Sequence, residues 1–305
     1  MRLLFVLLFA ALLGCAPEAS APEPESPAER PHEPLDLDDP DDNLHGFLKS
    51  RGSLDPDEDV VFYWTGTIYL AQDVDPLAAP ENDFPGPILR FEGFNIARFE
   101  PVADGVRMIS REIALYQDLQ GNVVDCWNNA RLGTDDPGMV PVVHVQNDPV
   151  NWTLGGGEYE ELGGRIVWKT EMQLAYPSPM SVAAYPEYSA SNTYQSLEMF
   201  NFFAERADLE DPTLDSAPVT ISWSRVGQLL PWMRPGQSTD KLVYHTHGAK
   251  LLGGYEELPA ALRGWVEANA PEYATAPATD ASPNITSWRW FKSLLDSGAY
   301  TPTCD

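Results

Sequence analysis

The sequence predicts an all-β, mainly antiparallel fold: a lipocalin-like (calycin-type) barrel of about eight or more strands, followed by C-terminal helices. Segments rich in β-branched and aromatic residues follow one another from residue 59 to residue 251 with short connections. Several of them carry large residues on both faces, as with Trp64 on one face and Tyr63 on the other. Such a sheet curls around an interior and is covered outside, and eight-stranded barrels of this kind can hold a small ligand.

Eight segments are expected to form strands, because apolar and polar residues alternate along them or because they are rich in β-branched and aromatic residues. A hairpin turn is expected at Gln120-Gly121, and the glycine-rich stretch 151–165 reads as a flexible loop at the barrel mouth. The segment 193–209 also has helical spacing, so a helix there stays open. The expected strands are 59–71, 88–102, 106–118, 140–152, 164–176, 193–209, 217–227 and 241–251.

Two helices are expected near the end of the chain. The first, 258–271, has Pro259 in its first turn and stops at Pro271. The second, 287–299, has Ser287 as a cap and Gly298 as its terminator.

The leader is typical of an exported protein. Arg2 precedes a short apolar run that ends in "LLGC", which resembles the lipobox of bacterial lipoproteins. That resemblance implies cleavage after residue 14 and a lipid on Cys15, which would tether the protein to a membrane. Because Ala16 follows the cysteine, we expect the outer membrane, with the soluble domain in the periplasm. The alternative is an ordinary secretory signal with an incidental cysteine.

Residues 15–46 read as a disordered, acidic, proline-rich tether, and 47–305 as a single β-rich domain. The formal charge of −27 disfavours nucleic acid as a partner. The run "DLDDPDDN" lacks the spacing, glycine and closing Glu of an EF-hand loop, so a solvated charge run is expected there.

The other two cysteines, Cys126 and Cys304, form an even pair in an oxidising compartment. A disulfide between them would fasten the C-terminal tail to the domain. Two buried or free thiols are the alternative.

Seven motifs together resemble the bacterial domain-of-unknown-function family 1838. The resemblance runs from about residue 47 to about residue 292 and implies a single domain, and many relatives are exported. It brings no established activity, substrate or catalytic residue. The motifs are, in order, "DVVFYWTGTIY", "FEGFNIAR", "REIALY", "VVHVQNDPVNW", "YQSLEMFNFF", "SWSRVGQLLPWM" and "LVYHTHGAKL".

Polar residues inside apolar strands are the candidate site residues, since a buried polar group is costly unless it is used or satisfied. His144 and Asp148 share a strand face and could form a base with its orienting carboxylate. An Asx-turn beside a structural histidine is the competing interpretation.

Charged residues on the strands suggest a polar pocket floor or, equally, cross-strand ion pairs. Arg111 and Glu112 are neighbours, so one of them must point inward. Arg225 is the other catalytic candidate. Expected ligand-binding residues are Trp64, Arg98, Trp152, Glu198 and Trp232.

His245 and His247 lie on one face of a strand. A zinc site would need three or four ligands. In the family that the chain resembles, a Tyr-His matches Tyr244-His245 and no second histidine stands at His247. We therefore expect no metal site, and His245 as an acid/base or ligand-binding residue.

Three functions remain open. The first is a lipid-anchored envelope protein whose barrel binds a small apolar or aromatic molecule. The second is a lyase, hydratase or isomerase without an organic cofactor that uses a histidine acid/base in the same pocket. The third is an envelope interaction protein without a pocket.

Overall fold

The computed structural model describes residues 34–72, 86–103, 105–129, 138–278 and 283–304. The predicted leader, Cys15 and most of the predicted tether lie outside these residues. Pro34–Asp305 forms one compact unit of the chain.

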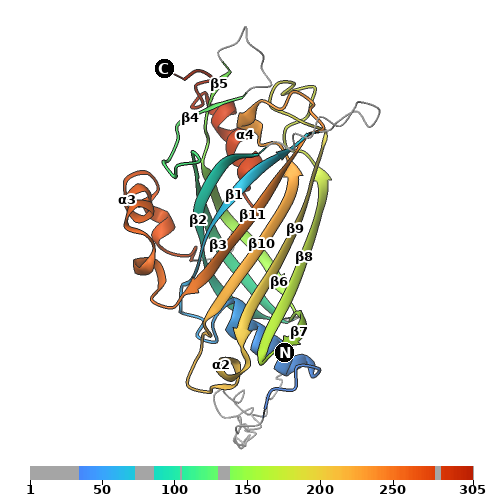
Figure 1. Cartoon of the computed structure of the whole chain (residues 1–305), viewed down its shortest axis with the longest axis vertical. Coiled ribbons are helices and arrows are strands. Elements are labelled where there is room, and N and C mark those ends of the chain that lie inside the picture. The colour runs from blue at the N-terminus through green and yellow to red at the C-terminus, as the bar shows by residue number, and fades with distance from the viewer. Residues whose placement is uncertain (1–33, 73–85, 104, 130–137, 279–282, 305) are drawn as a thin grey trace, which may run out of the picture. The chain divides into compact units, whose positions relative to one another are not determined.

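Its main element is an antiparallel sheet, which in the described residues has nine strands in the order β6-β3-β2-β1-β11-β10-β9-β8-β7 (Figure 1). A separate two-stranded sheet pairs β4 (Cys126–Asn128) with β5 (Met139–Pro141). The strands of the main sheet are β1 (Val60–Ala71), β2 (Pro87–Val102), β3 (Gly105–Gln117), β6 (Val145–Leu154), β7 (Glu158–Leu162), β8 (Arg165–Pro177), β9 (Thr193–Glu205), β10 (Val219–Gln228) and β11 (Lys241–Leu251).

The strands form an antiparallel meander in which the last strand pairs with the first. β1 pairs with β2 along one edge and with the last strand, β11, along the other. Among the described residues, the pairing is interrupted between β6 and β7, which follow each other in the chain. The sheet is therefore strongly curled and barrel-like, with one open seam, and the predicted calycin-type all-β fold with C-terminal helices is confirmed.

Glycines allow the sheet to curl tightly beside Trp64. The residues opposite Trp64 are Gly93 on β2 and Gly248 on β11. A Cβ at Gly93 would lie 2.2 Å from the Ile113 carbonyl oxygen, and a Cβ at Gly248 would lie 2.1 Å from the Tyr63 carbonyl oxygen. No side chain fits at either position, so the backbones approach closely there and leave room for the indole of Trp64.

Helices cover both ends and one side of the curled sheet (Figure 1). Near α1, a cluster including Phe47, Trp168 and Phe202 fills the lower end, and near α4 a second cluster including Trp232 and Phe291 fills the upper end. The third cluster packs α3 against the outer face of β1–β3. The helices are α1 (Pro40–Arg51), α2 (Arg206–Glu210), α3 (Ala260–Asn269) and α4 (Ser287–Ser297), with short 3₁₀ turns η3 (Pro231–Met233), η4 (Gly254–Glu257) and η5 (Pro271–Ala274).

The structure differs from the sequence prediction in three segments. The folded part begins before residue 47, because α1 starts at Pro40, capped by the Asp39 side chain, which accepts from the N–H groups of Asp41 and Asp42. That acidic run therefore begins a helix. The glycine-rich loop contains the strand β7, and the ambiguous segment 193–209 is the strand β9 followed by α2.

The tail of the chain is joined to the β4–β5 hairpin. Cys126 and Cys304 form a disulfide, 178 residues apart in the sequence. In the part of the chain that the structure describes, no helix is both long and apolar enough to cross a membrane.

Candidate functional site

The curled sheet encloses a cavity of about 430 Å³ between the two filled ends. Inward-facing side chains of eight strands line it, together with residues from α1 and from the start of α4. Its walls are mainly apolar and rich in aromatic residues. They include Trp64, Phe91, Trp152, Phe200, Trp223 and Tyr244.

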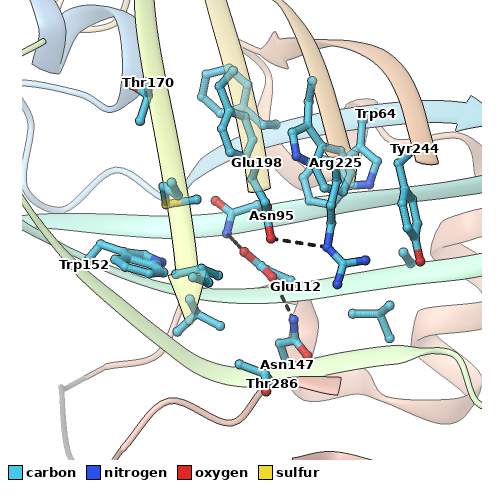
Figure 2. Close-up of a pocket in the computed structure, with 18 of the residues that line it drawn as sticks. Trp64, Asn95, Glu112, Asn147, Trp152, Thr170, Glu198, Arg225, Tyr244 and Thr286 are labelled. Carbon is cyan, nitrogen blue, oxygen red and sulfur yellow. Dashed lines mark hydrogen bonds and ion pairs between the residues drawn. The ribbon is translucent and has the colours of Figure 1, made fainter. Parts of the chain in front are cut away.

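A cluster of polar side chains lies in the middle of the cavity, centred on Glu112 (Figure 2). The amide of Asn147 donates to Glu112 Oε2 at 2.9 Å, and the amide of Asn95 donates to Glu112 Oε1 at 3.4 Å. Ser287 at the start of α4 in turn donates to Asn147 Oδ1 at 3.4 Å. Three strands and a helix thus hold one carboxyl group.

Burial raises the pKa of Glu112 above its usual value. The hydrogen bond from Asn147 and the positive charge of Arg51 act in the opposite direction, but the nearby Glu198 adds to the rise. A carboxyl with a raised pKa is protonated over a wider pH range and can then donate a hydrogen bond or a proton.

Arg225 and Glu198 form an ion pair on the neighbouring wall, with 3.4 Å between Arg225 Nε and Glu198 Oε1 (Figure 2). Arg225 also donates to the Tyr194 hydroxyl at 2.9 Å, and its guanidinium lies over the ring of Tyr244, 5.0 Å from the centroid. Arg225 on β10 and Glu198 on β9 lie directly opposite each other in the sheet register. The pair is therefore fixed by sheet register and by aromatic contacts.

Arg51 enters the cavity from its lower end, at the last residue of α1. Its guanidinium lies 4.9 Å from the ring centroid of Phe62, and its Nη1 atom has no hydrogen-bond partner. Burial lowers the pKa of Arg51 to about 10, against an opposing effect of Glu112. The group is nonetheless charged at neutral pH.

A buried lysine holds α1 in this position. Lys250 Nζ donates to the carbonyl oxygens of Lys49 and Gly52 at the end of α1, at 2.7 and 2.8 Å, and to Ser216 Oγ at 3.1 Å. The Lys250 side chain lies on the inner face of β11. It binds carbonyl groups that α1 leaves unpaired at its C-terminal end. The position of Arg51 thus depends on Lys250, near the C-terminal end of β11.

The segment before α4 lies along the free edge of β6. The Ile285 N–H donates to the Pro149 carbonyl, and the Asn284 side chain bonds both backbone groups of Asn151. These contacts bring Thr286 and Trp288 into the lining of the cavity.

The family model described as "Protein of unknown function (DUF1838)" matches residues 57–295. The chain belongs to this family. No curated protein matches the sequence.

In this DUF1838 protein, five of the residues expected at the site line the cavity. They are Glu112, Arg225, Glu198, Trp64 and Trp152.

The histidines lie elsewhere. His245 and His247 are exposed on the outer face of β11, whose inward residues are Tyr244 and Thr246. His144 precedes β6, and its Nδ1 accepts from the Tyr116 N–H at 3.1 Å. Burial lowers the pKa of His144 to about 4, so it stays neutral and serves as a structural acceptor.

The other expected site residues hold elements together outside the cavity. Arg111 pairs with Asp148 at 2.9 Å and donates to two carbonyl groups at either end of η5. Arg98 pairs with Asp59 at 2.5 Å, and Trp232 is buried in the upper cluster.

Sequence reasoning did not identify Arg51, Asn95 or Asn147 as site residues. Asn95 was detectable as an amide inside the apolar run "FEGFNIARF". Asn147 was not, because β6 carries an irregularity opposite Ser110–Glu112 that reverses which residues point inward. Arg51 ends a helix whose first residues, 40–46, had been assigned to the tether, so α1 was not expected.

Proposed function

We propose that this protein binds a small, mainly apolar or aromatic molecule inside its barrel. The observation that carries the proposal is the cavity of about 430 Å³, with aromatic walls and a few convergent polar groups. Small-molecule sites in proteins have this size and composition. An interaction protein without a pocket fits this interior less well.

The test uses two tryptophan substitutions on neighbouring residues of β8. Thr170 lines the cavity, whereas Glu171 is exposed on the outer face. The uncharged fluorescent probe N-phenyl-1-naphthylamine is titrated into the full chain. Thr170→Trp should weaken probe binding at least tenfold, and Glu171→Trp should leave it unchanged. No binding to the wild type, or equal binding to both variants, would overturn the proposal.

A second candidate function is proton-transfer catalysis without an organic cofactor. It is favoured by the position of the Glu112 carboxyl, which lines the cavity between the amides of Asn95 and Asn147 and whose pKa is raised by burial. The acid/base in this version is Glu112, because the histidines lie outside the cavity. Incubation with an envelope lipid extract, followed by mass spectrometry, should show products with the wild type and none with Glu112→Gln. The absence of any wild-type product rules this candidate out.

We further propose that a lipid on Cys15 anchors the domain to the outer membrane, facing the periplasm. The "LLGC" leader supports this location, and the Cys126–Cys304 disulfide suits an oxidising compartment. Labelling with a palmitate analogue should mark the wild type and not Cys15→Ser. Label on the variant, or wild-type protein in the inner-membrane fraction, would contradict the proposal.

A further inference from the structure

The charges inside the cavity come in two opposite pairs. Two arginines, Arg51 and Arg225, and two glutamates, Glu112 and Glu198, are the charged residues among those that line it. Arg225 contacts Glu198 directly, and Arg51 and Glu112 influence each other across the lower half of the cavity. When both glutamates are ionised, these four side chains sum to zero, in a protein whose formal net charge is −27.

With two arginines offset by two ionised glutamates, this interior has no net charge that would attract an anion or a cation. Removing an ion from water is costly unless an opposite charge and hydrogen bonds replace the water. Both arginines already have a carboxylate partner or neighbour, and the Glu112 carboxylate already accepts two amide hydrogen bonds. This charge balance disfavours the binding of an anionic ligand and of a cationic ligand alike.

The interior nevertheless offers hydrogen bonds to an uncharged group. Asn95 Oδ1 and Trp64 Nε1 have no hydrogen-bond partner, and both residues line the cavity. The first atom needs a donor and the second an acceptor. A hydroxyl group can pair with either atom, and a carbonyl group with the second. Unsatisfied buried polar atoms are unfavourable, so a ligand that pairs them gains affinity.

We propose that the ligand is an uncharged amphiphile, with an apolar body against the aromatic walls and a hydroxyl or carbonyl group at the Asn95–Glu112–Asn147 cluster. This inference rests on the proposed binding function and specifies the chemical class of its ligand.

Three probes that share a ten-carbon chain and differ only in their head group test the inference. They are 1-decanol, decanesulfonate and decyltrimethylammonium, whose charges do not change with pH. Each one displaces N-phenyl-1-naphthylamine from the full chain at pH 7.5. The expected result is that 1-decanol binds at least tenfold more tightly than either ion. A tighter sulfonate or a tighter ammonium overturns the inference and identifies an anionic or a cationic ligand.

Substitutions that unbalance the cavity give a second, independent measurement. Arg51→Met should shift the preference at least tenfold toward the ammonium probe, and Glu198→Gln should shift it toward the sulfonate. Glu171→Gln, on the outer face of β8, is the matched control and should leave the ranking unchanged. A ranking that does not respond to either interior substitution contradicts the charge argument. Should a variant fail to fold, the wild-type ranking still decides.

The two proposals fail in different ways. If the naphthylamine probe itself does not bind, the binding function is wrong. If the probe binds and a charged head group is preferred, only the ligand class is wrong.

Discussion

The side-chain amide of Asn147 on β6 donates a hydrogen bond to the Glu112 carboxylate on β3 at 2.9 Å. The bond joins the edge strand of the sheet to the centre of the cavity, at the point where the β3–β6 register shifts. It also helps to keep a carboxyl group inside an aromatic interior. Its strength therefore bears on both stability and ligand binding.

Replacing Asn147 with Leu should lower the free energy of unfolding by about 1–3 kcal/mol, because a buried carboxylate loses a donor. Urea denaturation measures this. In a Glu112→Met background the same substitution should cost much less, since no carboxylate remains to be satisfied. Equal costs in both backgrounds would show that the two residues do not act together.

The stability of the protein should depend on pH through Glu112. Burial raises its pKa above the usual value of 4.5, so between 4.5 and the raised pKa the folded state binds more protons there than the unfolded chain. The Glu112 contribution to stability is therefore lost as the pH rises through that window. Glu112→Gln should remove this pH-dependent loss of stability, because the glutamine side chain does not titrate.

The free energy of unfolding of Glu112→Gln, relative to the wild type, should thus rise with pH and level off above the window. Urea titrations from pH 4.5 to pH 8 measure it. Glu171→Gln on the exposed face is the control. A flat or falling difference for Glu112→Gln would contradict the raised pKa.

Loss of the Cys126–Cys304 disulfide should destabilise the fold by about 2–4 kcal/mol, because it constrains a long stretch of the unfolded chain. Denaturation with and without dithiothreitol measures the effect. The double variant Cys126→Ser/Cys304→Ser should match the reduced wild type and be insensitive to the reductant. Identical midpoints for oxidised and reduced wild type would contradict the bond.

Lys250→Met should destabilise the protein by roughly 2–4 kcal/mol and loosen α1. The substitution leaves the carbonyl groups of Lys49 and Gly52 without their donor. Hydrogen exchange across Pro40–Arg51 should accelerate selectively. Lys241→Met, at the other end of β11, is the matched control. Unchanged exchange in α1 would show that the lysine does not hold the helix.

Much of the fold could be predicted from alternation, because apolar and aromatic residues at every second position define strands. Trp64 and Tyr63 were correctly placed on opposite faces of β1 in this way. Alternation cannot tell which face of a strand is the interior when both faces carry large residues. For β11 we expected His245 at the site, but the structure places Tyr244 inside and leaves His245 exposed.

The charged residues of the candidate site were predictable only where they interrupt an apolar strand. Glu112, Glu198 and Arg225 gave that signal, and the structure brings all three to the cavity. Arg51 gave no signal, because it follows an acidic, proline-rich segment and reaches the cavity only once α1 has packed under the barrel. Local periodicity does not predict such long-range packing.

Native mass spectrometry of the full chain purified from cell envelopes tests the central claim most directly. We expect a non-covalent adduct of an uncharged small molecule on the wild type and on Glu171→Trp, and none on Thr170→Trp. An empty wild type that also fails to bind the naphthylamine probe, or an adduct that Thr170→Trp retains, would contradict it.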